Sequence, residues 1–139
     1  MPFAYHIAPD HNLAFYRGRG VITCSDAVGL FESYATHPEA CSGQNILCDL
    51  TDLREVRMDL DDRLRLQARM EPVLAAGGKP RLYVMYAPTA LSQRLAETFA
   101  EFWEAAPLIT VSVVRCKTKA AHMLRLPLNI IDLMQARLP

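Results

Sequence analysis

The chain has 139 residues with 15 basic and 15 acidic side chains, and its formal net charge of zero excludes a strong overall attraction to nucleic acids or anionic lipids. Hydrophobic residues make up 51% of the sequence and charged residues 22%, which favours a folded globular domain over a disordered chain. The first residues show no secretory signal, and the longest apolar runs fall well short of the about 20 residues that span a membrane. We therefore expect one cytoplasmic domain over residues 1–139, with no membrane span and no nucleic-acid partner.

Two strands and a helix are predicted for the first part of the chain. Strand-type runs cover residues 3–9 and 13–23, with turn-forming residues between them. Thr23 and Asp26 have the spacing of a helix-capping box, and apolar residues then recur at helical intervals as far as residue 35. The pattern indicates an antiparallel hairpin that leads into a helix.

The central part alternates apolar runs with a helical pattern. Residues 45–50 form a short apolar run that suits a strand buried on both faces. An imperfect helical stripe of apolar residues follows over 60–74, and the next strand is predicted at 81–88. We expect Pro72 to kink or interrupt the helix, because proline lacks a backbone N–H and its ring clashes with the preceding turn.

The last part continues the alternation. Thr89 can cap a helix whose apolar residues fall on one face, and a strand follows at 108–115. A short helix over about 117–124 and a C-terminal helical extension over 125–139 complete the order β-β-α-β-α-β-α-β-α. Because strands separated by helices require crossover connections, we predict an α/β fold with about five strands, mostly parallel, and an antiparallel strand at the edge.

Four segments carry a resemblance to a known family. "YHIAPDHNLAFYRGRGVIT" (5–23) is similar to an opening hairpin, and "NILCDLTDL" (45–53) to a central strand with an Asp-Leu-Ser/Thr exit. "LYVMYAPTALSQRLAETF" (82–99) is similar to a strand that ends in Ala-Pro with its following helix, and "VVRCKTKAAHML" (113–124) to a closing strand and helix. Together they resemble the SpoIIAA-like superfamily of STAS domains and anti-sigma-factor antagonists, in particular its bacterial single-domain branch.

The resemblance implies a non-enzymatic regulatory or protein-interaction domain with an unknown protein partner. Phosphoregulated antagonists carry Asp-Ser-Ser-Gly where the chain enters the helix after the central strand. The matching residues here are about Arg57-Met58-Asp59-Leu60, so the phosphorylatable serine is missing. We expect a strand-to-helix loop over Thr51–Leu60 to contact the partner. Its candidate contact residues are Thr51, Asp52, Arg57 and Asp59.

The acids of this stretch also have a structural interpretation. Asp59 can cap the next helix, and Asp61 and Asp62 suit its first turn, where negative charge is favoured. A metal site would need carboxylates that converge on one point, and these are spread over strand, loop and helix. Cys116 and His122, six residues apart on one short helix, are poorly placed as nucleophile and base. We therefore predict no catalytic residues, no metal and no cofactor.

A cluster of aromatic residues near the end of the third predicted helix has two interpretations. Phe99, Phe102 and Trp103 either pack on the sheet as core or line a pocket. The superfamily's distant likeness to Sec14-type lipid carriers implies that such a pocket would hold a small apolar, lipid-like ligand. A ligand carrier is therefore the alternative function.

The C-terminal extension also leaves two alternatives open. Its apolar residues Ile130, Ile131 and Met134 lie outside the part of the chain that resembles the family. They can dock on the chain's own core, or they can join two copies in a homodimer.

Overall fold

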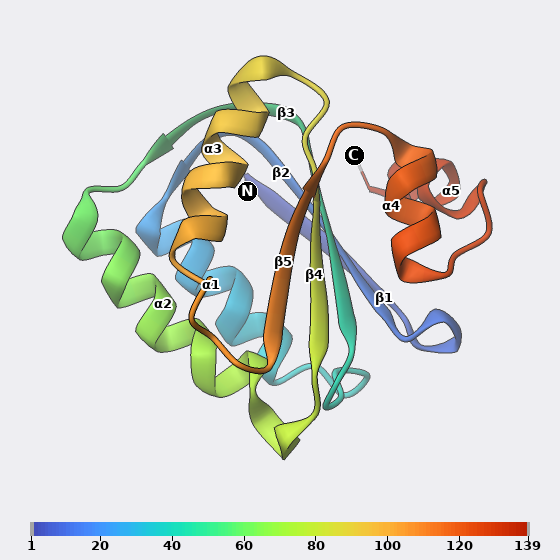
Figure 1. Ribbon diagram of the computed structural model, residues 1–139, viewed down its shortest axis with the longest axis horizontal. Coiled ribbons are helices and arrows are strands. Elements are labelled where there is room, and N and C mark those ends of the chain that lie inside the picture. Colours follow the sequence, from blue (N-terminus) through green and yellow to red (C-terminus); the bar gives the residue numbers. More distant parts are fainter. Residues whose placement is uncertain (1, 139) are drawn as a thin grey trace.

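The computed structural model describes residues 2–138, which form one sheet with helices on both faces (Figure 1). The five strands lie in the order β1-β2-β3-β4-β5. β1 is antiparallel to β2, and all other neighbouring pairs are parallel. The predicted mixed, mostly parallel sheet with an antiparallel edge is therefore confirmed. The strands are β1 (Phe3–Ala8), β2 (Leu13–Thr23), β3 (Asn45–Arg57), β4 (Arg81–Tyr86) and β5 (Ile109–Val114).

The helices divide between the two faces of the sheet. α1, α2 and α3 cover one face, and α4 and α5 cover the other (Figure 1). The order of elements along the chain is the predicted one. The helices are α1 (Cys24–Ala35), α2 (Leu60–Leu74), α3 (Ala90–Glu101), α4 (Lys117–Leu124) and α5 (Ile130–Arg137), with short 3-10 turns η1 (Pro9–His11) and η2 (Ala76–Gly78). No described helix is long and apolar enough to cross a membrane.

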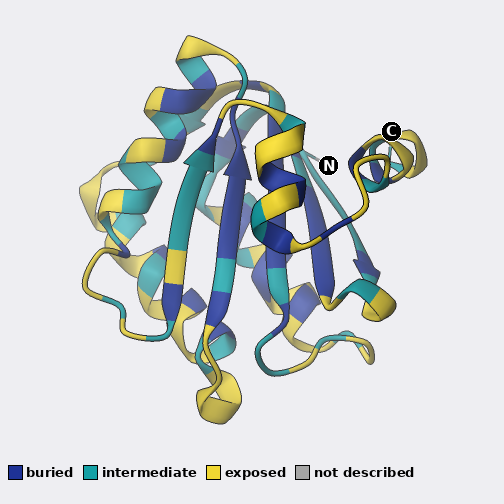
Figure 2. Ribbon diagram, turned by 45° about the vertical axis from the view of Figure 1, so that its right-hand side comes forward, coloured by how far each residue is buried: buried dark blue, intermediate teal, exposed yellow. Residues whose placement is uncertain are grey.

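The central strands are buried on both faces, as Figure 2 shows by their dark blue colour. Along β3, Ile46 and Cys48 pack toward α1, α2 and α3, whereas Leu47 packs toward α4 and α5. Successive side chains of a strand point to opposite faces, so one short apolar run supplies both cores. This explains why residues 45–50 are continuously apolar rather than alternating.

Capping boxes fix where three helices begin. Thr23 and Asp26 form such a box at α1, and Thr89 caps α3 by accepting a hydrogen bond from the backbone N–H of Ser92. At α2 the pair is Asp59 and Asp62. Each box satisfies backbone N–H groups that have no partner within the helix, and the caps predicted at Thr23, Asp59 and Thr89 are present.

β3 is longer than the sequence indicated, because it continues through Arg57 rather than ending near residue 50. Its pairing with β2 shifts register twice, and at each shift β3 contains one extra residue. These bulges let Leu50, Leu53 and Val56 all face the same core although they are spaced by three residues. The loop predicted over Thr51–Leu60 is therefore mostly strand.

Pro72 does not interrupt α2, so the expected interruption is absent. The helix continues to Leu74, two residues beyond the proline. Met70 and Leu74 on either side are fully buried against the core. Their burial compensates for the one backbone hydrogen bond that proline removes from the last turn.

Candidate functional site

The candidate partner-binding residues lie in two separate places. Arg57 and Asp59 flank the short connection from β3 to α2, whereas Thr51 and Asp52 lie within β3. Six residues of extended strand span roughly 20 Å, so Thr51 and Arg57 do not belong to one loop. The expectation of a single contact loop over Thr51–Leu60 is therefore corrected.

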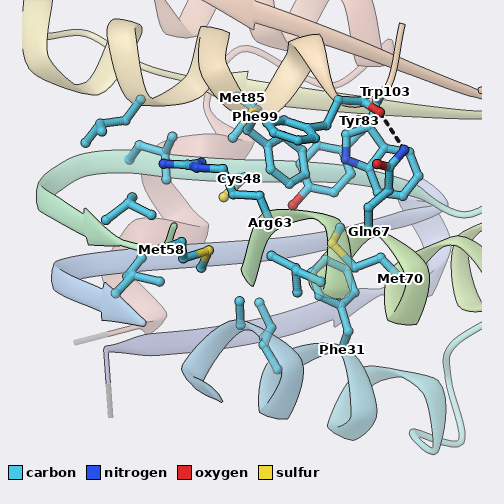
Figure 3. Close-up of a pocket in the computed structure, with 18 of the residues that line it drawn as sticks. Phe31, Cys48, Met58, Arg63, Gln67, Met70, Tyr83, Met85, Phe99 and Trp103 are labelled. Carbon is cyan, nitrogen blue, oxygen red and sulfur yellow. Dashed lines mark hydrogen bonds between the residues drawn. The ribbon is translucent and has the colours of Figure 1, made fainter. Parts of the chain in front are cut away.

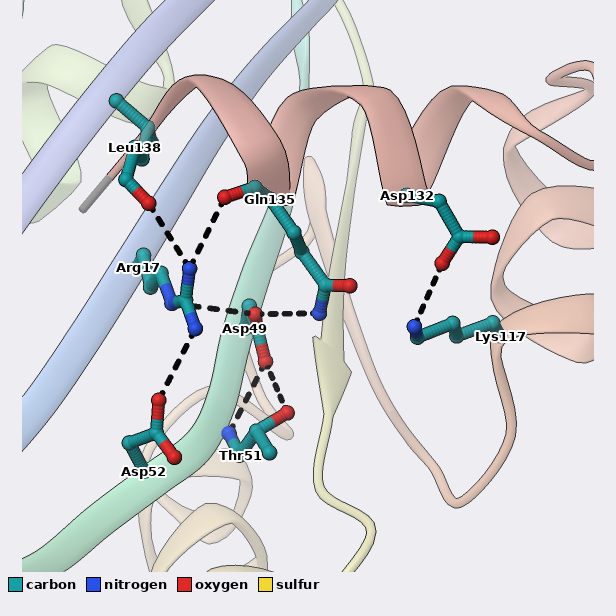
Figure 4. Close-up of polar contacts among 8 residues, drawn as sticks. All are labelled: Arg17, Asp49, Thr51, Asp52, Lys117, Asp132, Gln135 and Leu138. Carbon is teal, nitrogen blue, oxygen red and sulfur yellow. Dashed lines mark hydrogen bonds and ion pairs between the residues drawn. The ribbon is translucent and has the colours of Figure 1, made fainter.

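Thr51 and Asp52 belong to a polar cluster beneath α5 (Figure 4). The Thr51 hydroxyl donates a hydrogen bond to Asp49 at 2.6 Å, and Gln135 of α5 donates one to the same carboxylate at 2.8 Å. Arg17 on β2 bridges to Asp52 at 3.0 Å. Because Asp49 is fully buried, these contacts satisfy a carboxylate that would otherwise be costly to bury. The cluster joins α5 to the sheet.

Asp59 has a structural role at the start of α2. Its carboxylate accepts a hydrogen bond from the backbone N–H of Asp62 at 2.8 Å, and the carboxylate of Asp62 accepts one from the backbone N–H of Asp59 at 3.2 Å. Asp61 and Asp62 stand in the first turn, where the helix dipole favours negative charge. The helix-capping interpretation of the acidic stretch is therefore confirmed.

The first turns of α2 also present two exposed leucines. Leu60 is 63% exposed and Leu64 is 49% exposed. Residues four apart lie on one side of a helix, so the two side chains form a single apolar strip. Arg57, which is exposed at the end of β3, and Asp59 adjoin this strip. We call these four residues the α2 entry surface.

The C-terminal extension docks on the chain's own sheet. Ile131 and Met134 are buried in the core between the sheet and α4, and Ile130 packs against the edge of that core. Arg17 donates hydrogen bonds to the carbonyl groups of Gln135 and Leu138, which end α5 (Figure 4). The structure therefore shows the first of the two alternatives for this segment, docking on the chain's own core. Ile131 and Met134 are buried within the chain, so they do not form an exposed surface for a second copy.

A cavity lies between the sheet and helices α1, α2 and α3 (Figure 3). Its volume, measured as the space open to the centre of a water-sized sphere, is about 80 Å³. A cavity of this size holds more than a single water and has room for a short carbon chain. Its aromatic lining residues are Phe3, Phe31, Tyr83, Phe99, Phe102 and Trp103.

The three candidate pocket residues stand together on one wall of this cavity. Phe99 stacks between Tyr83 and Trp103, with ring centroids 5.3 Å and 6.1 Å apart. Trp103 is buried, while Phe99 and Phe102 are half-buried. The aromatic cluster thus packs on the sheet and lines a pocket at the same time.

The polar groups of the cavity come from α2 and the central strands. Arg63 extends from α2 on the side of Met58, while Gln67 points toward Trp103 and donates a hydrogen bond to the carbonyl of Phe102 (Figure 3). Burial, with a smaller contribution from the nearby Asp49 carboxylate, raises the pKa of the Cys48 thiol to about 12.

Burial likewise raises the pKa of Tyr83 well above its ordinary value. Cys48 and Tyr83 are neutral at pH 7 even at their ordinary pKa values, and burial keeps them neutral to higher pH. Arg63 carries the only charge among the described side chains that line the cavity. Over the described part of the chain, no three His, Cys, Asp or Glu side chains are grouped as metal ligands.

Comparison with solved structures places this architecture among known folds. One similar structure is an uncharacterised protein of the DUF3478 family from Shewanella loihica, which is described as having a SpoIIAA-like fold. It matches with a TM-score of 0.57 and 17% sequence identity, and the match covers 88% of this chain and 93% of that protein. The chain has a SpoIIAA-like fold. The anti-sigma factor antagonist SpoIIAA in its unphosphorylated form matches with a TM-score of 0.51 at 11% identity, over 88% of this chain and 97% of its own. No protein-family model matches the chain, and no curated protein matches its sequence significantly.

The residues that line the cavity were only partly predicted from the sequence. Phe99, Phe102 and Trp103 were candidates, but Arg63 and Gln67 were not. The signal for them was present, because positions 63, 67, 70 and 74 follow the helical spacing i, i+4, i+7 and i+11. That spacing puts Arg63 and Gln67 on the same stripe of α2 as the buried Met70 and Leu74.

Proposed function

We propose that the chain is a non-enzymatic regulatory domain that binds a protein partner through the α2 entry surface. The observation that carries this proposal is the exposure of Leu60 and Leu64 on one side of the first turns of α2. Two large apolar side chains that are left in water beside charged neighbours are typical of a protein-binding site. Two other exposed leucines, Leu128 and Leu133, lie in the C-terminal region instead.

The position of this surface in the fold supports the same proposal. One structure with the same fold is an anti-sigma factor antagonist, a protein named for its action in a regulatory system. The segment Arg57-Met58-Asp59-Leu60 is where the family resemblance places the regulatory residues. Asp59 is engaged in capping α2, so we propose that it shapes the contact surface rather than imitating a phosphoserine.

Site-specific photo-crosslinking in the source cells tests the proposal. A photoreactive residue is placed at Leu64, and a matched one at Leu133, which is 54% exposed on α5. We expect one defined protein adduct from position 64 that position 133 does not give. The same partner should then fail to co-purify with a Leu60→Ser, Leu64→Ser variant. Equal crosslinking from both positions, or none from position 64, would contradict the proposal.

A second candidate function, a carrier for a small apolar ligand, is favoured by the cavity. Its walls are almost entirely aliphatic, methionine and aromatic side chains, as expected for ligand pockets. Titration with 1-octanol, followed by amide chemical shifts in a two-dimensional NMR spectrum, tests it. We expect shifts at residues around the cavity. A Met58→Trp variant, which places a large ring at the half-buried lining position Met58, should reduce them, and shifts confined to other surfaces would count against a carrier.

A further inference from the structure

Arg63 differs from the other arginines of α2 in its surroundings. Arg65 and Arg69 are exposed and pair with Asp62 and Glu32. Arg63 is half-buried and lines the apolar cavity. Among residues 2–138, its guanidinium has no hydrogen bond or ion pair within contact distance. A positive charge thus stands at an apolar cavity without a protein countercharge.

The chemistry of the Arg63 guanidinium indicates which kind of ligand group would pair with it. Arg63 is half-buried at the cavity, and the cavity walls supply no acid that could pair with its charge. The guanidinium is a planar fork of N–H donors that matches a carboxylate with two parallel hydrogen bonds. The other ionisable groups of the wall, Cys48 and Tyr83, are neutral at pH 7.5, because their pKa values lie at or above the ordinary ones, so they do not repel an incoming anion.

The apolar walls of the cavity determine the rest of a ligand that carries such a carboxylate. The cavity continues from α2 toward the sheet among side chains such as Leu66, Met70, Met85 and Phe99. Its volume of about 80 Å³ suits a short, flexible hydrocarbon chain better than a bulky ring system. A linear chain with an acidic end would place its apolar part in the cavity and its charge at Arg63.

We propose that the cavity binds the hydrocarbon chain of a short or medium-chain carboxylic acid, and that Arg63 binds its carboxylate. This inference rests on the proposed carrier function and specifies its ligand class. Arg63 would act as the residue that distinguishes acids from neutral chains of equal length. Gln67, one turn further along α2, is occupied by the carbonyl of Phe102, so the carboxylate would depend on Arg63 alone.

Calorimetric titration of the whole chain with octanoate and with 1-octanol at pH 7.5 tests the inference. The two compounds share a chain length and differ in the charge of the head group. We expect octanoate to bind at least tenfold more tightly than 1-octanol, in line with the strength of charge-assisted hydrogen bonds. Arg63→Gln should abolish this preference by weakening the binding of octanoate. Arg65→Gln, which removes an exposed arginine two residues away, should keep the preference.

The outcomes separate this inference from the carrier proposal on which it rests. If both compounds bind wild-type protein equally, the carrier proposal stands and the role of Arg63 is overturned. If neither binds, both proposals are overturned. A preference that disappears equally in Arg63→Gln and Arg65→Gln would show a general effect of charge, and would overturn the assignment to Arg63. The comparison of octanoate with 1-octanol on wild-type protein does not depend on whether a variant folds. Arg63→Lys keeps the positive charge but loses the planar pair of N–H donors, so it should retain only part of the preference.

Discussion

The side-chain amide of Gln135 on α5 donates a hydrogen bond of 2.8 Å to the buried carboxylate of Asp49 on β3, across 86 positions of the sequence. Arg17 binds the same region from β2, through carbonyl groups of α5 and through Asp52. Its Nε also lies 3.7 Å from the Asp49 carboxylate. The end of the chain is therefore fixed to the sheet by polar contacts as well as by apolar packing.

Replacement of Arg17 by methionine should destabilise the fold. The substitution leaves the buried Asp49 carboxylate without its positive neighbour and frees the carbonyl groups at the end of α5. We expect the free energy of unfolding, measured by urea denaturation, to fall by about 2–3 kcal/mol. Arg19→Met, at an exposed position of the same strand, should change it by less than about 0.5 kcal/mol. Equal effects of the two variants would contradict the role given to Arg17.

Ile131 and Leu133 provide a matched pair for testing how α5 docks. Ile131 is fully buried, whereas Leu133 is 54% exposed on the same helix. We expect Ile131→Ala to lower the free energy of unfolding by about 2–4 kcal/mol, because it removes buried methyl groups and leaves a cavity. Leu133→Ala should have an effect below about 0.5 kcal/mol. If Ile131 instead joined two copies of the chain, the loss would depend on protein concentration.

The sequence predicted the order of elements well because each element carries a local signal. Thr23, Asp59 and Thr89 cap helices, and strand and helix periods alternate along the chain. The length of β3 could not be predicted in the same way. Its apolar residues Leu50 and Leu53 are spaced by three, which does not match the period of two of a regular strand until the two bulges are known. Bulges depend on pairing with β2, so no local pattern reveals them.

The candidate site shows the same limit at the level of tertiary structure. The sequence predicted Phe99, Phe102 and Trp103 as one cluster because they are neighbours on one segment. Arg63 shares the cavity with them from a different helix. Charged residues on a helix are usually expected to face water. The helical spacing puts Arg63 on the same stripe of α2 as Met70 and Leu74, but only the packing of α2 against the sheet shows that this stripe borders a cavity.

Asp59 should stabilise the start of α2 through its hydrogen bond and not through its charge alone. Asp59→Ala removes the acceptor for the backbone N–H of Asp62, and we expect a loss of about 1 kcal/mol in the free energy of unfolding by urea denaturation. Asp59→Ser keeps an oxygen that can cap the helix, so it should retain most of the stability. A serine variant as unstable as the alanine variant would show that the negative charge is what the helix requires.

The buried thiol of Cys48 should make the fold sensitive to alkaline pH. Its pKa is about 12 in the folded chain, against an ordinary value of 9.0. Between these values the unfolded chain binds fewer protons than the folded chain, so stability falls as pH rises. Urea denaturation between pH 9 and 10 should show a slope that Cys48→Ala reduces, while the tyrosines of the unfolded chain account for part of the slope that remains. Cys116→Ala, at an exposed position, should leave the slope unchanged, and a slope that Cys48→Ala does not alter would contradict this assignment.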